Sequence, residues 1–400
     1  MILGGINMAR ADSISPCKHY HLCGGCSNLN LDYNIQLHNK VNMVKRLFKK
    51  HCITDYNFTG IIPSPNIYSY RNKMEFSFGY FQGEKRLELG LHPKGDPVNV
   101  ITVDDCYLID EDFRKILKTV LNYFKTQGVT PYNVKKRKGY LRNLVIRKGF
   151  NTGELLINLV TTSQSYHDCQ ELVEEAKSLD LNGNLIGFLH TINDNRSDIV
   201  DCDNLYTLYG RDYFFEEIMD LKFKIKPFSF FQVNSAAAEK LYQMILNFIN
   251  KDVRNKNRLI YDLYCGTGTI SQIIASKTDK VLGIEIDKDA VITARKNTEL
   301  NKIDNCEFIS GDAARKIHKL DESPDTVIVN PPRPGLHKDV IDQIKEFAAP
   351  ELIYSSCNPE TLASDLQELT DNLYNIGEVK CIDMFPHTTH IETCTRVTLR

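Results

Sequence analysis

The stretch Leu259-Ile-Tyr-Asp-Leu-Tyr-Cys-Gly-Thr-Gly-Thr269 decides the fold. It opens with the apolar residues of a buried strand, passes through a tight glycine turn and leads into the helical pattern of Ile270–Ser276. A second apolar run follows at Lys280-Val-Leu-Gly-Ile-Glu-Ile286. A strand, a glycine turn, a helix and a further strand in this order predict a parallel βαβ unit.

The same alternation continues to the end of the chain. The expected strands cover Cys306–Ile309, Asp325–Val329, Leu352–Ser355, Val379–Met384 and Thr395–Leu399, and the expected helices cover Lys288–Leu300, Lys338–Phe347 and Glu360–Leu373. This pattern predicts an α/β fold with a Rossmann-like, doubly wound parallel sheet. The last two strands are expected to join that sheet as an antiparallel addition.

The length of 400 residues allows two or three domains, and the texture of the sequence divides it into three regions. Residues 1–56 hold a cysteine cluster and a helix. Residues 57–225 contain short alternating runs interrupted by helical stretches near Asp110–Lys125 and His167–Leu179, which predict a central α+β domain. Residues 226–400 form the Rossmann-like domain.

Composition places the chain among ordinary globular proteins, with 42% hydrophobic and 25% charged residues. No apolar stretch is long enough to span a bilayer, and Met1–Arg10 lacks the apolar core of a secretory signal. A cytoplasmic monomer without membrane contact is therefore expected. A net charge of −2 still permits a nucleic-acid partner, because a local basic patch is enough to bind phosphates.

Two basic regions are candidates for such a patch. The helix expected over Leu31–Lys50 has an apolar stripe and a basic side, and the basic side is either a solvated face or an RNA contact. The stripe comprises Ile35, Leu37, Val41, Val44, Leu47 and Phe48, and the basic side comprises Lys40, Lys45, Arg46, Lys49 and Lys50. The second region, interpreted as a phosphate track, comprises Lys135–Lys138, Arg142, Arg147 and Lys148, with Arg71 and Lys73 as its extension.

Three of the twelve cysteines, Cys17, Cys23 and Cys26, lie within ten residues. In a chain without a secretory signal, this density favours a metal or cluster site over disulfides. Cys106 is the candidate for the fourth ligand, and His19 and His21 compete for that position. Structural zinc sites usually take their ligands from two pairs of residues, each pair closely spaced in the sequence. Three clustered thiolates with a remote fourth instead favour an iron–sulfur cluster.

The glycine turn indicates a nucleotide-containing ligand. Gly266 and Gly268 allow the backbone to approach the ligand, and Glu285, at the end of the next strand, can accept both ribose hydroxyls. A dinucleotide fingerprint needs three glycines in the pattern G-x-G-x-x-G, and this turn has only Gly266 and Gly268. The shorter turn favours S-adenosylmethionine, which has no pyrophosphate, and hence a methyltransferase over a dehydrogenase.

Cys357, in Ser356-Cys-Asn-Pro359, is expected where a strand gives way to a helix. It is either a small buried core residue or a nucleophile at the carboxyl end of the sheet. Thiolate addition to carbon 6 of uracil makes carbon 5 nucleophilic toward a sulfonium methyl group, and a base must then remove the proton from carbon 5. Cys357 and Glu392 match these two roles, with His387 and His390 as alternative bases. The helix after Asn358 is expected to favour the thiolate.

In these features the chain resembles the uracil-5 RNA methyltransferase family. The matching pieces lie in order along nearly the whole chain: Cys17-x5-Cys23-x2-Cys26 with Cys106, Gly139–Arg147, Phe230–Asn234, Asp262–Gly268, Asn330–Arg333, Ser356–Pro359 and Phe385–Glu392. The resemblance implies that Cys357 is the nucleophile and Glu392 the base. It further implies donor contacts from Gln232, Tyr264, Glu285 and Asn330, and a 4Fe–4S cluster on Cys17, Cys23, Cys26 and Cys106.

The chain departs from the family in two respects. Asn330 stands where many members have aspartate, so its contact with the methyl donor carries no charge. Cys17 lies so near the start that no N-terminal RNA-binding barrel is expected before it. Bacterial members with a cluster are mostly rRNA enzymes, so 23S rRNA is the expected partner and tRNA the alternative. A non-catalytic RNA-binding protein and an amino- or protein-directed methyltransferase are the competing hypotheses.

Overall fold

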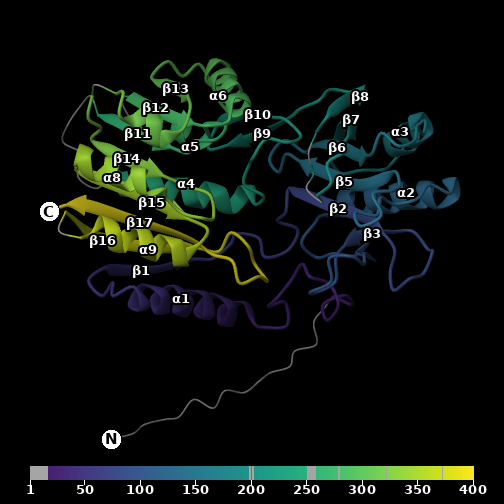
Figure 1. Cartoon of the computed structure of the whole chain (residues 1–400), viewed down its shortest axis with the longest axis horizontal. Coiled ribbons are helices and arrows are strands. Elements are labelled where there is room, and N and C mark those ends of the chain that lie inside the picture. Colours follow the sequence, from purple (N-terminus) through teal and green to yellow (C-terminus); the bar gives the residue numbers. More distant parts are fainter. Residues whose placement is uncertain are drawn as a thin grey trace, which may run out of the picture.

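The alternation of strands and helices after Leu259 builds one eight-stranded sheet in the computed structural model (Figure 1). The structure describes residues 17–197, 200, 202–249, 258–277, 280–320, 322–371 and 373–400. The strand order in this sheet is β1-β16-β17-β15-β14-β11-β12-β13. Its strands are β1 (Asn57–Ile62), β11 (Leu259–Leu263), β12 (Lys280–Glu285), β13 (Cys306–Ser310), β14 (Thr326–Val329), β15 (Glu351–Ser356), β16 (Tyr374–Ile382) and β17 (Glu392–Leu399).

The strands β11 to β15 are parallel, and β17 runs antiparallel to both of its neighbours, β15 and β16. The predicted Rossmann-like α/β sheet with a late antiparallel addition is therefore confirmed. In Figure 1, β17 ends at the outer edge of the molecule, so its first residues lie on the side that faces the second lobe.

Helices cover both faces of this sheet, because successive side chains of a buried strand point to opposite faces. Ile260 packs in the cluster that contains the helices α4 (Ser235–Ile249), α5 (Thr269–Ala275) and α6 (Lys288–Asn301). Its neighbour Tyr261 packs in the opposite cluster, with α1 (Tyr33–Lys50), α7 (Ala313–Ile317), α8 (Lys338–Phe347) and α9 (Pro359–Leu369).

A seven-stranded sheet forms the second lobe, in the order β4-β3-β2-β5-β6-β7-β8 (Figure 1). Its strands are β2 (Lys73–Gly79), β3 (Glu88–Leu91), β4 (Ile101–Thr102), β5 (Leu141–Lys148), β6 (Glu154–Thr161), β7 (Asn184–Ile192) and β8 (Asn204–Gly210). The helices α2 (Glu111–Gln127) and α3 (Gln170–Lys177) contribute to its core, and a hairpin of β9 (Phe214–Ile218) and β10 (Leu221–Ile225) leads to the first lobe.

The strand β1 differs from the expected organisation, in which residue 57 began the central domain. It pairs in parallel with β16 at the edge of the eight-stranded sheet. The physical reason is that Phe58 and Ile61 pack into the apolar cluster beneath α1. The central sheet itself begins at Lys73, and the division of the chain into three domains stays a prediction.

The helix α1 buries Val44 and Phe48 of the predicted apolar stripe, but its buried face also includes two polar residues. Its buried residues are Gln36, Lys40, Val44 and Phe48, whereas Ile35 is 47% exposed. The assignment of Lys40 to the solvated basic side was therefore wrong. Lys45, Arg46 and Lys49 line a shallow surface depression with Asn39 and Asn42, as expected for the basic side.

Among the helices of the described residues, none has both the length and the apolar character needed to cross a bilayer.

Candidate active site and cysteine site

The glycine turn after β11 lies at the carboxyl edge of the sheet. Tyr264, Gly266 and Gly268 all have positive φ, at 63°, 56° and 74°. Gly268 cannot be replaced without displacement, because a Cβ there would lie 2.5 Å from the ring of Phe308. The turn therefore packs closely against Phe308 of β13, and without side chains at Gly266 and Gly268 a ligand can approach its backbone.

Glu285 closes the turn from the neighbouring strand β12. Its Oε2 accepts a hydrogen bond of 2.9 Å from the amide of Gly266, and its Oε1 accepts one of 2.9 Å from the amide of Asp287. Asn330, which directly follows β14, lies at the same edge because β14 is the other neighbour of β11. The predicted donor residues Tyr264, Glu285 and Asn330 therefore come from three adjacent strand ends.

Gln232 lies on the segment between the β9–β10 hairpin and α4, and Asn72 holds that segment. The side-chain amide of Asn72 donates hydrogen bonds to the carbonyl of Gln232 (2.9 Å) and to Ser235 Oγ (2.8 Å). Asn234 in turn donates to Ser64 Oγ and to the carbonyl of Met384, both at 3.1 Å. These buried amides connect the two lobes beside the sheet edge.

Asp262 is a buried acid in β11 that sequence reasoning did not single out. Burial raises the pKa of Asp262 to about 7, and Ser271 donates a hydrogen bond to its Oδ2. Its Oδ1 is buried without a hydrogen-bond partner among the described residues. An acid inside the apolar run Leu259-Ile-Tyr-Asp-Leu263 was the signal that could have identified it.

Cys357 lies between the end of β15 and the start of α9 and is partly exposed. Asn358 caps α9, since its side chain accepts a hydrogen bond from the amide of Glu360 (3.2 Å), and Pro359 takes the first helical position. The predicted strand-to-helix junction is therefore present. The side chain of Asn358 also donates to the carbonyl of Arg333 (3.0 Å), which fixes the Asn330–Gly335 turn beside Cys357.

Glu392 is the first residue of β17, directly beyond the end of the β15–β17 ladder. That ladder pairs Ser355 with Cys394 and Ser356 with Thr393, so its next step sets Cys357 opposite Glu392. The Glu392 carboxylate is fully buried and accepts a hydrogen bond of 2.9 Å from Ser355 Oγ. The antiparallel strand thus brings together two residues that are far apart in the sequence.

The protonation of both groups follows from their surroundings. Burial raises the pKa of Glu392 to about 7, and the hydrogen bond from Ser355 acts in the opposite direction. Burial also raises the pKa of the Cys357 thiol, and the charge of Glu392 raises it further. The net shift is thus upward, opposite to the direction expected from the helix terminus. Arg333, which sequence reasoning did not single out, lowers the pKa of Cys357 through its charge and a hydrogen bond.

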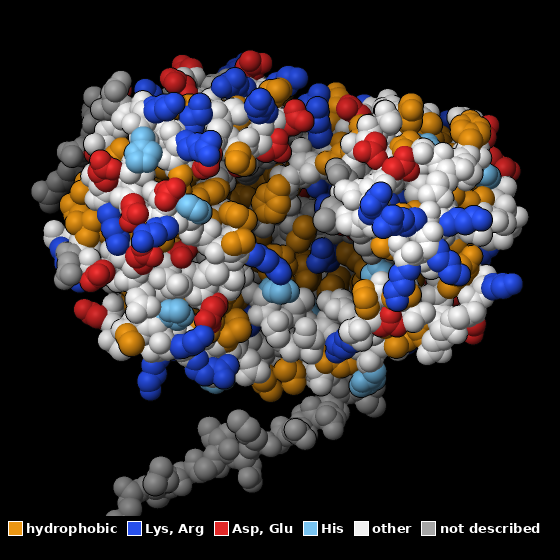
Figure 2. All heavy atoms as spheres, in the orientation of Figure 1, with side chains coloured by type: hydrophobic (Ala, Val, Ile, Leu, Met, Phe, Trp, Pro, Cys, Tyr) orange, Lys and Arg blue, Asp and Glu red, His pale blue; other side chains and the backbone are white. Residues whose placement is uncertain are grey.

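The two histidines offered as alternative bases have different environments. His387 is buried, and its Nδ1 lies 3.1 Å from Nε2 of Gln36 in α1. His390 is exposed at the tip of the loop that precedes β17. Although the residue is exposed, partial desolvation of its ring lowers the pKa of His390, and the positive charge of Arg333 lowers it further, which favours the neutral ring at pH 7. Figure 2 shows a hollow between the two lobes, the side toward which this strand edge faces.

The four predicted cysteine ligands line one cavity, together with apolar side chains such as Leu29, Leu91 and Leu108. His19 also lines this cavity, but its Nε2 lies 3.3 Å from Asp105; His21 is not among the lining residues. The amide of Gly25 donates a hydrogen bond of 3.3 Å to the sulfur of Cys23. Burial, together with the neighbouring thiols Cys106, Cys23 and Cys17, raises the pKa of Cys26 to about 12.

The spacing of these thiols bears on the kind of ligand. Among the described residues, the one group of three or more possible ligand atoms within 4.8 Å of each other is His19, Asp104 and Asp105. No three of the four sulfurs therefore lie all within 4.8 Å of one another, whereas a tetrahedral zinc with Zn–S bonds of about 2.3 Å holds its sulfurs roughly 3.8 Å apart. Four thiols around one cavity are a donor set that could hold an iron–sulfur cluster.

The cysteine segment also joins the two lobes. On one side, Gly24 donates to the carbonyl of His92 (3.0 Å) and Lys94 donates to that of Leu22 (2.9 Å), in the loop between β3 and β4. On the other side, the amides of Ser27 and Asn28 both donate to the carbonyl of His387, at 2.9 and 3.0 Å. The segment that holds three of the four thiols therefore contacts the loop that leads to Glu392.

Much of the predicted phosphate track is not available to a ligand. Arg142 is buried and donates to the carbonyls of Asn193 and Asn195, and Arg147 is buried and donates to those of Lys226 and Ser229. Lys148 forms ion pairs with Asp110 and Asp112. These three cations have structural partners, which corrects the prediction. The four consecutive cations Lys135–Lys138 are exposed on a loop.

The chain is similar to several known proteins. The family model described as tRNA (Uracil-5-)-methyltransferase matches residues 32–399. A protein of Clostridium tetani described as an uncharacterized RNA methyltransferase is 49% identical over 94% of this chain and 82% of its own length. A relative from Caldanaerobacter subterraneus with the same description is 47% identical over 94% and 83%.

A solved structure extends the similarity to the fold. The Pyrococcus abyssi tRNA (uracil-54, C5)-methyltransferase, in complex with S-adenosyl-L-homocysteine, is 27% identical. The two structures superpose with a TM-score of 0.74 over 94% of this chain and 86% of that one.

Proposed function

The chain belongs to the tRNA (uracil-5-)-methyltransferase family, and on this premise we propose that it converts a uridine of RNA to 5-methyluridine with S-adenosylmethionine as donor. The observation that carries the proposal is the register of β15 and β17, which sets Cys357 opposite Glu392 at the edge where the glycine turn lies. A nitrogen methyltransferase would need neither a nucleophile nor a base of this kind.

Cys357 acts as the nucleophile in this mechanism. Its thiolate forms a bond to carbon 6 of the uracil, and the electron pair of the 5,6 double bond moves to carbon 5 and into the carbonyl as an enolate. S-Adenosylmethionine supplies the methyl group that carbon 5 takes up. Glu392 then removes the proton from carbon 5, the double bond re-forms and the thiolate leaves carbon 6.

The environment of Glu392 suits proton removal, and at Cys357 one neighbour counteracts the raised pKa of the thiol. A base with a pKa near 7 is ionised in a large fraction at neutral pH and still holds a proton well, which suits proton transfer. Arg333 lowers the pKa of Cys357 and so favours the attacking thiolate, which makes it a candidate for keeping the nucleophile reactive. It also compensates in part for the charge of Glu392.

The donor site is assigned to the strand ends around the glycine turn. Glu285 would hold the ribose hydroxyls, and Gln232, Tyr264 and Asn330 would contact the rest of the donor. Asp262 lies near the end of β11, just before the glycine turn. Its Oδ1, which has no hydrogen-bond partner among the described residues, is suited to accept a hydrogen bond from the ammonium group of S-adenosylmethionine. Because residue 330 is asparagine and not aspartate, its contact with S-adenosylmethionine would be a hydrogen bond without a charge.

RNA is the substrate class, and we propose 23S rRNA, with tRNA as the alternative. The four-cysteine set supports rRNA through the resemblance described above, whereas the family description and the Pyrococcus relative favour tRNA. The exposed cations Lys135–Lys138 are suited to contact phosphates. Phe230, which is 71% exposed two residues before Gln232, is suited to stack on an unpaired base.

Mapping of 5-methyluridine tests this function directly. In cells that lack the gene, we expect one or more uridines of 23S rRNA or tRNA to lose the 5-methyl group, because the enzyme that adds it there is missing. Sequencing-based mapping of both RNAs, with the wild-type gene restored as control, identifies the substrate. An unchanged 5-methyluridine content in both RNAs would contradict the proposal.

We propose that Cys17, Cys23, Cys26 and Cys106 hold a 4Fe–4S cluster. The group would cross-link the N-terminal segment to the loop after β4, since its ligands come from both. The hydrogen bond from Gly25 to Cys23 is of the kind that stabilises cluster thiolates. The high pKa values of these thiols mean that the ligands must lose protons when the group binds.

Substitution of one ligand should remove the cluster. For Cys23→Ser and Cys106→Ser we expect anaerobically purified protein to lose its visible absorption and its iron, and to unfold at a lower temperature, because the cross-link is gone. Cys52→Ser, at an exposed thiol outside the site, should keep all three. If the wild-type protein is colourless and holds one zinc per chain, the cluster proposal is wrong and the four cysteines bind a structural zinc.

A further inference from the structure

The buried stripe of α1 has an unusual composition. Gln36, Lys40, Val44 and Phe48 follow one another at intervals of four residues, so they form a single line along the helix. The second half of this line is apolar and packs on the sheet. The first half is polar, although Lys40 is only 2% exposed and Gln36 is fully buried. Burying a lysine is costly unless it is paired, so its partners indicate what it does.

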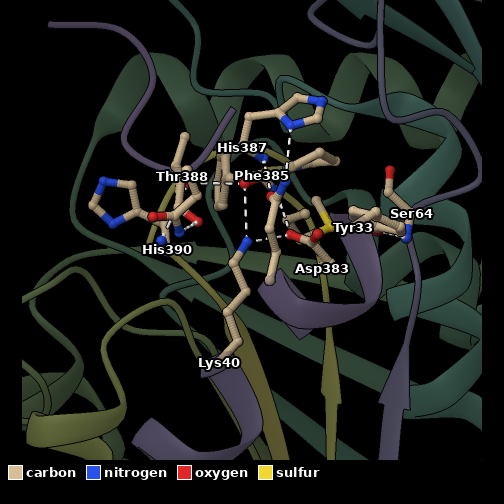
Figure 3. Close-up of polar contacts among 12 residues, drawn as sticks. Tyr33, Lys40, Ser64, Asp383, Phe385, His387, Thr388 and His390 are labelled. Atoms are coloured by element: carbon tan, nitrogen blue, oxygen red, sulfur yellow. Dashed lines mark hydrogen bonds and ion pairs between the residues drawn. The ribbon is translucent and has the colours of Figure 1, made fainter. Parts of the chain in front are cut away.

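Lys40 contacts the loop that connects β16 to β17 (Figure 3). Its Nζ lies 2.6 Å from Oδ1 of Asp383 and donates a hydrogen bond of 3.0 Å to the carbonyl of Phe385. The same Oδ1 accepts a hydrogen bond of 3.1 Å from the amide of Phe385. Lys40 therefore closes a small ring of polar contacts that fixes the first turn of this loop.

Gln36, one helical turn earlier, fixes the middle of the same loop. Its Oε1 accepts a hydrogen bond of 2.9 Å from the amide of His387, and its Nε2 lies 3.1 Å from His387 Nδ1. His387 has a φ of 67°, a left-handed conformation that is strained for a histidine. The ring of Tyr68 stacks on the other side at 4.9 Å between centroids. Two polar side chains of α1 thus hold the loop in a conformation that it would not adopt alone.

This loop leads directly into Glu392. Ile382, the last residue of β16, is paired with Glu392, and residues 383–391 form the whole connection between them. Of these residues only Thr389 and His390 are exposed. The backbone of Glu392 is held by its pairing with Ile382, and its carboxylate accepts one hydrogen bond, from Ser355. How the carboxylate meets a bound base therefore also depends on the loop that packs beside it. Apolar side chains at positions 36 and 40 would make none of these hydrogen bonds to the loop.

We propose that Gln36 and Lys40 are positioning residues that hold the 383–391 loop so that Glu392 reaches the proton at carbon 5 of the uracil adduct. This inference rests on the proposed function, in which Glu392 is the base. It assigns the two residues to the proton-removal step, after the bond to Cys357 has formed and the methyl group has been transferred.

The test separates adduct formation from proton removal. A 5-fluorouridine has fluorine at carbon 5, where a base has no proton to remove, so the adduct with Cys357 forms and persists without Glu392. The probes are total RNA from cells that lack the gene and the same RNA from cells grown with fluorouracil. The variants are Gln36→Leu and the double variant Lys40→Met/Asp383→Asn, in which no buried charge is left unpaired. Val44→Ala, on the same stripe but with an apolar side chain that makes no hydrogen bond to the loop, is the matched control.

For both loop variants we expect methylation turnover on normal RNA to fall at least tenfold, since a displacement of about 1 Å can cost roughly 10²-fold. Adduct formation with fluorinated RNA should stay within about twofold of wild type. Val44→Ala should show no such split. The inference is overturned if the variants lose both activities in equal proportion, or if they lose neither. A wild-type protein that forms no adduct and transfers no methyl group overturns the proposed function as well, which distinguishes the two failures.

Discussion

Replacement of Cys357 with alanine should abolish methyl transfer while S-adenosylmethionine still binds. The thiol supplies the bond to carbon 6 that makes carbon 5 nucleophilic, and no other group in the site can replace it, so we expect a loss of at least about 10³-fold in turnover. The donor residues lie on the glycine turn and the neighbouring strand ends, which this substitution does not touch. Isothermal titration with the donor and a methylation assay on RNA from cells without the gene measure the two effects.

Two further measurements make this prediction specific. Covalent protein–RNA adducts, detected on a denaturing gel, should be absent from Cys357→Ala even with fluorinated RNA. Cys52→Ser, which removes an exposed thiol from the turn after α1, should methylate RNA at the wild-type rate. Methylation by Cys357→Ala at more than a few per cent of that rate would mean that the reaction does not pass through a covalent bond to this residue.

The sequence predicted the local parts of this site because each part is encoded in a short stretch. The glycine turn with Glu285 and the junction at Cys357 follow from strand, turn and capping signals that adjoin one another. Cys106, predicted as the fourth ligand, lines the same cavity as the other three cysteines, and its role as a ligand stays a prediction. What a short stretch cannot encode is the register between β15 and β17, which decides whether Cys357 and Glu392 face each other.

Charged residues were the least predictable feature, because their partners are distant in sequence or belong to the backbone. Lys148 forms ion pairs with Asp110 and Asp112, and Arg147 binds two carbonyl groups in the linker before α4. A basic cluster in the sequence therefore resembled a phosphate track. Lys40 was misplaced for the same reason: its partner Asp383 lies 343 residues away, and nothing near Lys40 indicates that its face of α1 meets a polar loop.

Replacement of Glu392 with glutamine should stop the reaction one step later than the loss of Cys357. Glutamine keeps the shape and still accepts the hydrogen bond from Ser355, but it cannot take a proton from carbon 5. We expect one methyl group to be transferred per enzyme molecule, followed by accumulation of the methylated covalent complex and a fall of at least about 10³-fold in turnover. A denaturing gel with radioactive donor shows the trapped complex, which wild-type enzyme should not accumulate.

The pH dependence gives the same assignment a second test. Burial raises the pKa of Glu392 to about 7, so more of the carboxylate is ionised as pH rises through 7 and proton removal by wild-type enzyme should become faster. The negative charge of Glu392 also raises the pKa of Cys357. Because Glu392→Gln removes that charge, the thiolate should form at lower pH, and the midpoint of adduct formation should shift downward. His390 is the competing base, and its neutral ring could also accept a proton. If His390→Ala rather than Glu392→Gln traps the methylated complex, the base is His390, and Glu392 serves only to set the charge around Cys357.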